Sequence, residues 1–294
     1  MNFSIETLLK NKPVLLDGSW GTELQKMGLN PGNCPDEWNL TNPDKVFKVA
    51  EDYVMAGSSI ILTNTFRSNK IALSNFNLEN SVTELNKKGV EISKEAAAGR
   101  AKVFASIGPS GKLLVTGEIN VNELEDIFTQ QAEIIAEAGA DGIVIETMSD
   151  LNEAIIALKS VRKTNLTVAV CMVFDSGKEK DKTMMGDSIE NVVKSLVDEG
   201  ADIIGANCGQ GIESFIKTCS SMKKLSPVPV WIKPNAGIPK YVNGKIIYDT
   251  SPEDFASFIP SLLEAGADFV GGCCGTTPDY IRLVGKKIEE FKTH

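Results

Sequence analysis

Short apolar runs alternate with longer stretches of helical periodicity along the whole chain. Eight runs rich in valine and isoleucine have the length of buried strands, and each is followed by a segment with apolar residues every three or four positions. The runs are 14–17, 59–64, 103–107, 142–146, 167–174, 203–207, 228–233 and 269–272. The helical segments are 44–56, 82–100, 123–138, 151–162, 188–199, 212–224, 253–265 and 279–291. This alternation is typical of βα units around a parallel sheet, so we predict an α/β fold.

The number of units favours a barrel over an open sheet. A phrase Ala/Glu-Gly-Ala-Asp precedes three of the predicted strands, at 138–141, 199–202 and 265–268, where glycine suits the left-handed residue that ends a helix. Eight strands with eight helices fit a closed (β/α)8 TIM barrel better than a doubly wound sheet, although the pattern does not itself show closure. We expect one domain over residues 1–294.

The amino-acid composition excludes some classes of binding partner. The chain of 294 residues is 42% hydrophobic and has a formal net charge of −9, so no basic surface is available for a phosphate backbone. We expect neither nucleic acid nor an anionic membrane as a partner. The first residues do not resemble a leader, and no apolar stretch approaches the roughly twenty residues of a membrane span. A cytoplasmic location is therefore expected.

Histidine and cysteine usage restricts the chemistry. The only histidine is His294, the last residue, which excludes a Ser-His-Asp triad, a Cys-His pair and a histidine-rich metal site within the body of the domain. In a large chain without an export signal, the six cysteines indicate reduced thiols or metal ligands.

Three cysteines follow two of the predicted strands. Cys208 comes after the sixth run, and Cys273 and Cys274 come after the eighth. The active site of such barrels is built where strands end, and only the seventh strand separates the sixth from the eighth. The glycines around the adjacent pair permit the bend that both side chains need to face one ion. We predict a zinc site with three thiolate ligands and an open fourth position. The alternative is a set of small buried thiols.

The remaining cysteines and aromatic residues have a more ordinary interpretation. Cys34, Cys171 and Cys219 lie in a loop, a strand and a helix, where structural roles are favoured. Aromatic candidates for the pocket wall, which could equally belong to the core, are Trp20, Phe66 and Trp38. The segment 108–112 has the wrong glycine spacing for a phosphate loop, and we interpret it as a turn.

The ligand set points to a thiol substrate. Zinc with three thiolates polarises a carbonyl weakly but keeps an incoming thiol deprotonated at neutral pH. With no histidine and no metal-water base indicated, methyl transfer to that sulfur is more natural than hydrolysis. A thiol amino acid also needs its ammonium group held, and Asp17 and Glu146 end two strands on the same barrel face. The alternative is that both carboxylates cap helices or bind backbone amides.

The same residues resemble the homocysteine-binding domain of the homocysteine S-methyltransferase family. The matching phrases are LDGSWGTEL at 16–24, TNTF at 63–66, ETM at 146–148, NC at 207–208, KPNAG at 233–237 and GGCCGTTP at 271–278. The resemblance implies a (β/α)8 barrel whose zinc is bound by Cys208, Cys273 and Cys274, with the thiolate of homocysteine as fourth ligand and methionine as product.

The resemblance also implies the substrate residues. Asp17 and Glu146 would hold the ammonium group, and backbone near Gly18 and Ser19 would meet the carboxylate. Asn207 and Asn235 join them as candidates for the substrate pocket. In the cobalamin-dependent branch, the asparagine matching Asn235 would occupy the open zinc position before the substrate arrives.

The methyl donor stays open between several possibilities. Residues 63–66 and 235–239 are more similar to the N-terminal module of cobalamin-dependent methionine synthase than to members that use S-methylmethionine or betaine. We expect methylcobalamin carried by a separate corrinoid protein, and a methyl-folate system is the other possible partner. The chain could equally be an excised module of a longer enzyme. The alternatives are a small sulfonium or ammonium donor, a different thiol acceptor, and a zinc- or thiol-binding protein without turnover.

Overall fold

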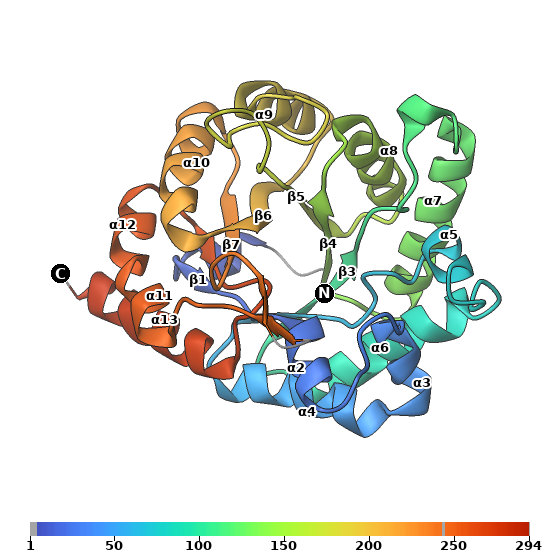
Figure 1. Ribbon diagram of the computed structural model, residues 1–294, viewed down its shortest axis with the longest axis horizontal. Coiled ribbons are helices and arrows are strands. Elements are labelled where there is room, and N and C mark those ends of the chain that lie inside the picture. The colour runs from blue at the N-terminus through green and yellow to red at the C-terminus, as the bar shows by residue number, and fades with distance from the viewer. Residues whose placement is uncertain (1–4, 243–244, 294) are drawn as a thin grey trace.

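Eight parallel strands form the central sheet of the computed structural model, which describes residues 5–242 and 245–293 (Figure 1). The strands are β1 (Val14–Leu15), β2 (Ile60–Leu62), β3 (Lys102–Ile107), β4 (Gly142–Met148), β5 (Thr167–Met172), β6 (Ile203–Gly211), β7 (Val230–Asn235) and β10 (Phe269–Val270). Their spatial order is β1-β10-β7-β6-β5-β4-β3-β2. Every predicted strand is therefore present, and β6 and β10 lie on either side of β7.

The two outer strands of this order meet and close the ring. The backbone N–H of Ser59 donates to the carbonyl oxygen of Leu15 at 2.8 Å, and the Ser58 hydroxyl donates to the carbonyl oxygen of Leu16 at 3.1 Å. A third link is the backbone N–H of Leu62, which donates to the Asp17 carboxylate. The prediction of a (β/α)8 barrel is confirmed.

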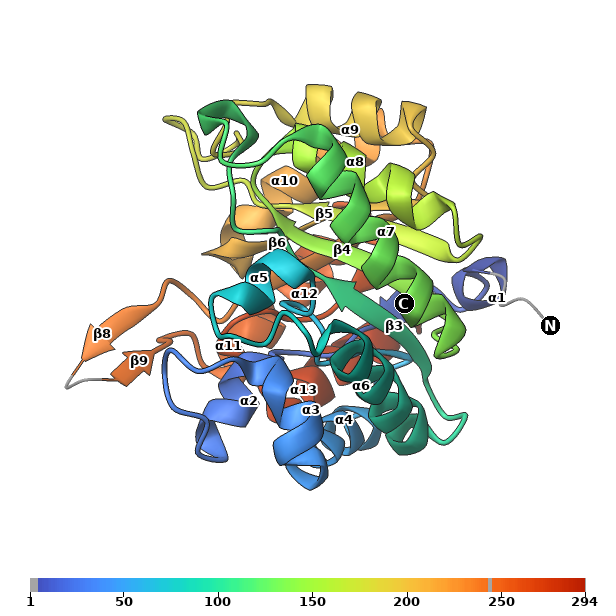
Figure 2. The same ribbon diagram turned by 90° about the vertical axis from the view of Figure 1, so that its right-hand side faces the viewer.

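The predicted helical segments surround the strands (Figures 1 and 2). They are α4 (Pro43–Met55), α6 (Val82–Ala97), α7 (Val121–Glu137), α8 (Leu151–Arg162), α9 (Ile189–Asp198), α10 (Ile212–Leu225), α11 (Pro252–Ser257), α12 (Ile259–Glu264) and α13 (Pro278–Lys292). The segment predicted as one helix over 253–265 is broken at Phe258. Pro260 has no N–H to donate to the preceding turn, so the hydrogen-bond ladder is interrupted there.

Several short elements were not predicted. They are α1 (Ile5–Leu9), α2 (Trp20–Lys26), the 3-10 turns at Pro35–Glu37 and Leu114–Thr116, α3 (Trp38–Thr41), α5 (Lys70–Ser74) and the strands β8 (Lys240–Val242) and β9 (Lys245–Ile247). β8 and β9 pair in antiparallel fashion and project away from the barrel (Figure 2). Most of these elements lie in the loops after the barrel strands, where the site is built.

The barrel interior is filled by side chains from alternate strand positions. Trp231 is fully buried and stacks between Phe104 and Phe269, with ring centroids 5.9 and 5.3 Å away. Lys233, two positions further along β7, is also buried and points to the same interior one layer higher. The aromatic layer thus closes the barrel beneath a polar layer. In the described part of the chain, no helix has both the length and the apolarity to cross a membrane.

Gly205 of β6 gives a test of interior packing. A methyl group there would overlap the carbonyl oxygen of Trp231 and lie 2.7 Å from the sulfur of Cys171. We expect Gly205→Ala to lower the free energy of unfolding by about 1–3 kcal/mol, measured by urea denaturation. Gly21→Ala is the control, because its methyl would meet no atom within 4 Å. Equal stability of the two variants would contradict this packing.

Candidate metal and substrate site

The three predicted ligand thiols meet at the carboxyl end of the barrel. The sulfur atoms of Cys208, Cys273 and Cys274 all lie within 4.8 Å of one another, and those of Cys208 and Cys274 are 3.9 Å apart. Two sulfurs bound to one zinc ion at about 2.3 Å and a tetrahedral angle lie roughly 3.8 Å apart. The thiols therefore fit a zinc ion with three protein ligands.

Cys208 reaches this position through an unusual backbone conformation. Its φ is +62°, and Thr147 at the end of β4 has the same φ of +62°. Left-handed conformations are uncommon for residues with a β-carbon and cost about 1 kcal/mol or more. Asn207 ties the two positions together: its Oδ1 accepts from the Thr147 N–H and its Nδ2 donates to the Thr147 hydroxyl, both at 2.8 Å. The same Nδ2 lies 3.8 Å from the sulfur of Cys273.

The end of β7 holds the adjacent cysteine pair. The Cys273 N–H donates to the carbonyl oxygen of Pro234 at 2.7 Å, and the Ala236 N–H donates to that of Cys274 at 2.9 Å. The side-chain oxygen of Asn235 accepts from the Cys274 N–H at 3.1 Å. The strand between β6 and β10 thus fixes the bend that turns both thiols to one side.

The protonation of the thiols favours a cation at this place. The pKa of the Cys208 thiol lies well below its usual range, because the thiols of Cys273 and Cys274 donate hydrogen bonds to its sulfur. The pKa values of Cys273 and Cys274 are raised, since both interact with that negative sulfur and both are buried. Even without a metal, one negative charge is therefore held on the Cys208 sulfur, and thiolate sulfur is a ligand that zinc accepts readily.

Asp17 is completely buried, and its carboxylate accepts three hydrogen bonds. One oxygen accepts from the ammonium of Lys233 at 2.5 Å. The other accepts from the Trp20 indole at 2.8 Å and from the Leu62 N–H at 2.7 Å. This carboxylate therefore forms an ion pair with a residue of the chain itself.

Glu146 is the carboxylate that faces the cavity. One oxygen accepts from the Ser106 hydroxyl at 2.5 Å, and the side chain is 8% exposed. Burial raises the pKa of Glu146, while the charge of Lys233 and the hydrogen bond from Ser106 oppose that rise. A positively charged group in the cavity would stabilise its ionised form.

A cavity of about 330 Å³ joins the thiols to Glu146. Its wall includes Cys208, Cys273, Cys274, Glu146, Lys233, Ser106, Thr147, Tyr248, Gly18, Ser19, Trp20 and Phe66. Of the predicted aromatic candidates, Trp20 and Phe66 line this cavity, whereas Trp38 is buried in the core. Asp17, Asn207 and Asn235 lie behind the wall and do not line the cavity. The volume suits a small amino acid.

The homology comparisons agree with this geometry. Residues 14–288 match the sequence model described as homocysteine S-methyltransferase. The chain belongs to the homocysteine S-methyltransferase family.

Two mycobacterial proteins are similar in sequence to this family member. The methionine synthase of Mycobacterium leprae is 29% identical over 300 residues and that of Mycobacterium tuberculosis 28% over 301. Each match covers 97% of this chain but 25% of the relative, so the chain spans about a quarter of their length. Among solved structures, the homocysteine methyltransferase MmuM from Escherichia coli has the same fold, with TM-scores of 0.80 (oxidized form) and 0.79 (metallated form) at 23% identity. Both alignments cover 96% of this chain and 99% of the MmuM chain.

Several site residues of this family member had no predicted role. Lys233, Ser106, Thr147 and Tyr248 all line the cavity. Burial and the nearby thiols, that of Cys274 first among them, raise the pKa of Tyr248. The sequence contains a signal for Lys233. Residues two positions apart on a strand face the same side, so Lys233 lies on the same face as Trp231, and a lysine there is unusual enough to indicate a buried charged partner.

The other three cysteines are buried and do not line the cavity. Burial raises the pKa of Cys34 and of Cys219 to about 12, and it raises that of Cys171 as well. Buried, protonated thiols fit the structural roles that the sequence favoured for all three.

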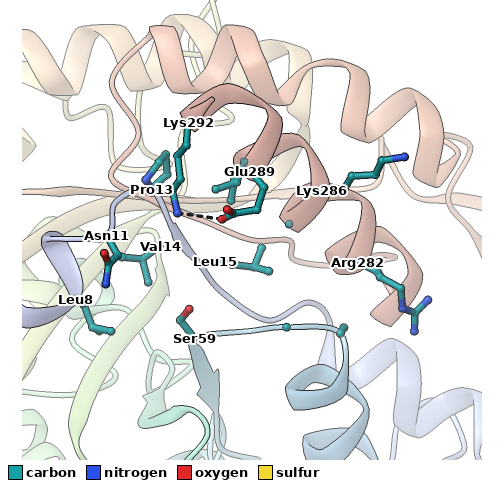
Figure 3. Close-up of a pocket in the computed structure, with 14 residues that line it drawn as sticks. Leu8, Asn11, Pro13, Val14, Leu15, Ser59, Arg282, Lys286, Glu289 and Lys292 are labelled. Atoms are coloured by element: carbon teal, nitrogen blue, oxygen red, sulfur yellow. Dashed lines mark hydrogen bonds and ion pairs between the residues drawn. The ribbon is translucent and has the colours of Figure 1, made fainter. Parts of the chain in front are cut away.

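A second cavity, of about 420 Å³, lies where α13 meets the start of β1 (Figure 3). It is lined by Leu8, Pro13, Val14, Leu15, Ser59, Arg282, Lys286, Glu289 and Lys292 among others. Lys292 pairs with Glu289, three residues before it on α13. This cavity shares no lining residue with the one beside the thiols, and its described lining contains no group of metal ligands.

Asp36 supports the cavity wall and gives a pH-dependent prediction. It is 1% exposed and accepts hydrogen bonds from the Arg67 N–H and the Ser68 hydroxyl, both at 2.7 Å. Burial raises its pKa from 3.8 to about 6, although these hydrogen bonds oppose the rise. The folded protein therefore binds a proton that the unfolded chain has lost between pH 4 and 6, and stability falls as the pH rises through that window.

The variant Asp36→Asn removes this titration. We expect the stability of the wild type relative to Asp36→Asn to fall by about 3 kcal/mol between pH 4 and 7, from urea unfolding at several pH values. If the difference in unfolding free energy between the two proteins does not change with pH, the pKa of Asp36 is not raised in the folded protein.

Proposed function

We propose that this chain transfers a methyl group to the sulfur of homocysteine to give methionine, with a zinc ion held by Cys208, Cys273 and Cys274. The observation that carries the proposal is the meeting of three thiols within 4.8 Å at the wall of a small cavity. Membership of the homocysteine S-methyltransferase family supports the identity of the acceptor.

The ion and the protein would have separate tasks. A zinc ion with three thiolate ligands and an open position keeps a substrate thiol deprotonated at neutral pH, which makes it a nucleophile. The chain would position the ion through its second layer of residues: Asn207 contacts the sulfur of Cys273, and Asn235 accepts a hydrogen bond from the Cys274 N–H. Asn235 uses its oxygen for the Cys274 N–H, so it would have to give up that bond before it could act as a ligand itself.

The amino acid part of the substrate would lie toward Glu146 and Gly18. Glu146 presents a carboxylate to the cavity. The Ser19 N–H is already bound to the Thr276 carbonyl oxygen at 3.1 Å, and the Ser19 hydroxyl binds Thr22. The Gly18 N–H has no partner among the described residues and lies at the cavity wall, which makes it the donor that we assign to the substrate carboxylate.

For the methyl donor we propose a methylcorrinoid carried by another protein or module. The mycobacterial relatives are named methionine synthases and extend far beyond the part matched here. Tyr248 lines the cavity. Its neighbour Ile247 at the end of β9 and Ile238 just before β8 are 46% and 64% exposed. Exposed apolar side chains on a projecting segment suit the docking of a large donor.

The metal assignment is tested by cysteine variants. We expect about one zinc per chain in the wild type, and a loss of most zinc and of methyl transfer in Cys208→Ala and Cys273→Ala, because two thiols bind zinc too weakly. Cys219→Ala is the matched control, since it removes a buried thiol that is not part of the trio. Elemental analysis of purified protein measures the content. Full zinc in Cys273→Ala would contradict the assignment.

The donor and the enzymatic role are tested together. Zinc-loaded protein is incubated with homocysteine in four parallel reactions, each with one donor: methylcobalamin, methyl-folate, betaine or S-methylmethionine. The methionine formed in each reaction is quantified. We expect methylcobalamin to give turnover that Cys274→Ala reduces at least about a thousandfold, because the thiol nucleophile is then not activated. If only betaine or S-methylmethionine supports turnover, that compound and not a methylcorrinoid is the methyl donor. Tight zinc binding without turnover on any donor would favour the zinc-binding protein.

A further inference from the structure

Thr147 adopts a backbone conformation that its side chain disfavours. Its φ is +62°, in the left-handed region, where a β-branched residue is a clear outlier. The pairing of β4 with β5 shifts register between Ile145 and Met148, so Thr147 lies in an irregularity near the end of its strand. Such irregularities beside a site re-aim a side chain. Glycine would adopt this backbone at no steric cost, so the presence of threonine points to a use for its side chain.

Asn207 determines how the Thr147 hydroxyl can bond. The backbone N–H of Thr147 can only donate, so the atom of Asn207 that faces it at 2.8 Å must be the side-chain oxygen. The other end of that amide, Nδ2, is therefore the donor to the Thr147 hydroxyl, also at 2.8 Å. The hydroxyl oxygen accepts this bond, and its own proton is left to donate. Within residues 5–242 and 245–293, which the structure describes, no acceptor takes that proton.

The Thr147 hydroxyl lies beside the thiols. Thr147 lines the same cavity as Cys208 and Cys273. The Asn207 Nδ2 that donates to the Thr147 hydroxyl is also 3.8 Å from the Cys273 sulfur, so one nitrogen contacts both groups. The residue after Asn207 is Cys208, which has the same left-handed φ of +62°. The hydroxyl is therefore held next to the thiol cluster at the cavity wall.

A hydroxyl proton at this place distinguishes two forms of sulfur. A thiolate is a charged acceptor, and a hydrogen bond to a charged group is roughly twice as strong as one between neutral groups. A thioether sulfur is only a weak acceptor. Methyl transfer converts the first into the second, because an electron pair of the thiolate forms the new sulfur–carbon bond and the donor keeps the pair of the bond that breaks. The hydroxyl therefore favours the acceptor over its methylated product.

We propose that Thr147 is a catalytic residue of the acceptor site: its hydroxyl donates a hydrogen bond to the sulfur of the incoming thiolate, and this bond is lost when the sulfur is methylated. The inference rests on the proposed function, since it names a hydrogen-bond donor to the sulfur that receives the methyl group. Asn207 is then a positioning residue, because its two bonds to Thr147 hold the left-handed backbone and orient the hydroxyl.

Three substitutions at Thr147 separate the hydroxyl from the backbone. Thr147→Ser keeps the hydroxyl, Thr147→Ala removes it but keeps the strained backbone, and Thr147→Gly removes both the hydroxyl and the strain. Each zinc-loaded protein is titrated in a calorimeter with homocysteine, and with methionine by displacement, and its zinc content and urea midpoint are measured. Ala98→Gly is the matched control, because Ala98 has a left-handed φ of +47° at the end of α6 and does not line the cavity.

The proposal predicts that affinity follows the hydroxyl and stability follows the backbone. Thr147→Ala and Thr147→Gly bind homocysteine about tenfold or more weakly than the wild type, as expected for a lost hydrogen bond to a charged acceptor, and Thr147→Ser restores the affinity to within about threefold. Affinity for methionine changes by less than about threefold in every variant, and all keep their zinc. Thr147→Gly has a higher urea midpoint than Thr147→Ala, and Ala98→Gly a higher one than the wild type, because glycine relieves the strain.

A purely structural role for Thr147 predicts a different pattern. Thr147→Ala would then bind homocysteine as the wild type does, and that result overturns the proposal. A parallel loss of affinity for homocysteine and methionine, or a loss of zinc in Thr147→Ala, overturns it as well, because the hydroxyl would then act on the pocket or on the metal site and not on the acceptor sulfur. If Thr147→Ala does not fold, the comparison of Thr147→Gly with Thr147→Ser still decides.

The same titrations separate this inference from the proposed function. A zinc-loaded wild-type protein that does not bind homocysteine would remove both. Normal binding of homocysteine by the wild type together with equal binding by Thr147→Ala would remove this inference alone.

Discussion

The site depends on the order of three neighbouring strands, β10, β7 and β6. Parallel strands that emerge side by side bring residues far apart in the sequence to one edge, and here they bring Cys208 to the Cys273–Cys274 pair. The middle strand contributes no thiol but fixes both sides, through Pro234 and Asn235 on the cysteine pair. The left-handed backbone at Cys208 is the local strain that this arrangement stabilises.

Electrostatics in the layer below the thiols is equally constrained. The aromatic stack of Phe104, Trp231 and Phe269 fills the barrel beneath the polar layer. Because Asp17 and Lys233 are buried above this stack, each of these charges needs a partner within the protein. Lys233 and Asp17 form that balance, and Asp17 also joins β1 to β2 through the Leu62 N–H. The residue that helps to close the barrel is therefore also the one that holds the Lys233 ammonium in the polar layer.

Much of this architecture was predictable from local patterns. The eight strands follow from apolar runs such as that of Val230 to Ile232, and the three ligand cysteines follow from their position after strands. The β8–β9 segment was missed, although an Asn-Gly dipeptide between residues of high strand propensity is a known hairpin signal. The pairing of Lys233 with Asp17 joins residues 216 positions apart, and only the register of the barrel brings them together. Likewise, the sequence places Asn207 near the pocket, but its bonds to Thr147 depend on two left-handed residues that no pattern in the sequence announces.

The central claim is that three sulfur atoms of this chain surround one metal ion and leave room for a fourth. X-ray absorption at the zinc edge tests it most directly. The account predicts three sulfur neighbours at about 2.3 Å in the zinc-loaded protein and four after homocysteine is added. A shell dominated by oxygen or nitrogen, or a sulfur count that homocysteine does not change, would contradict it.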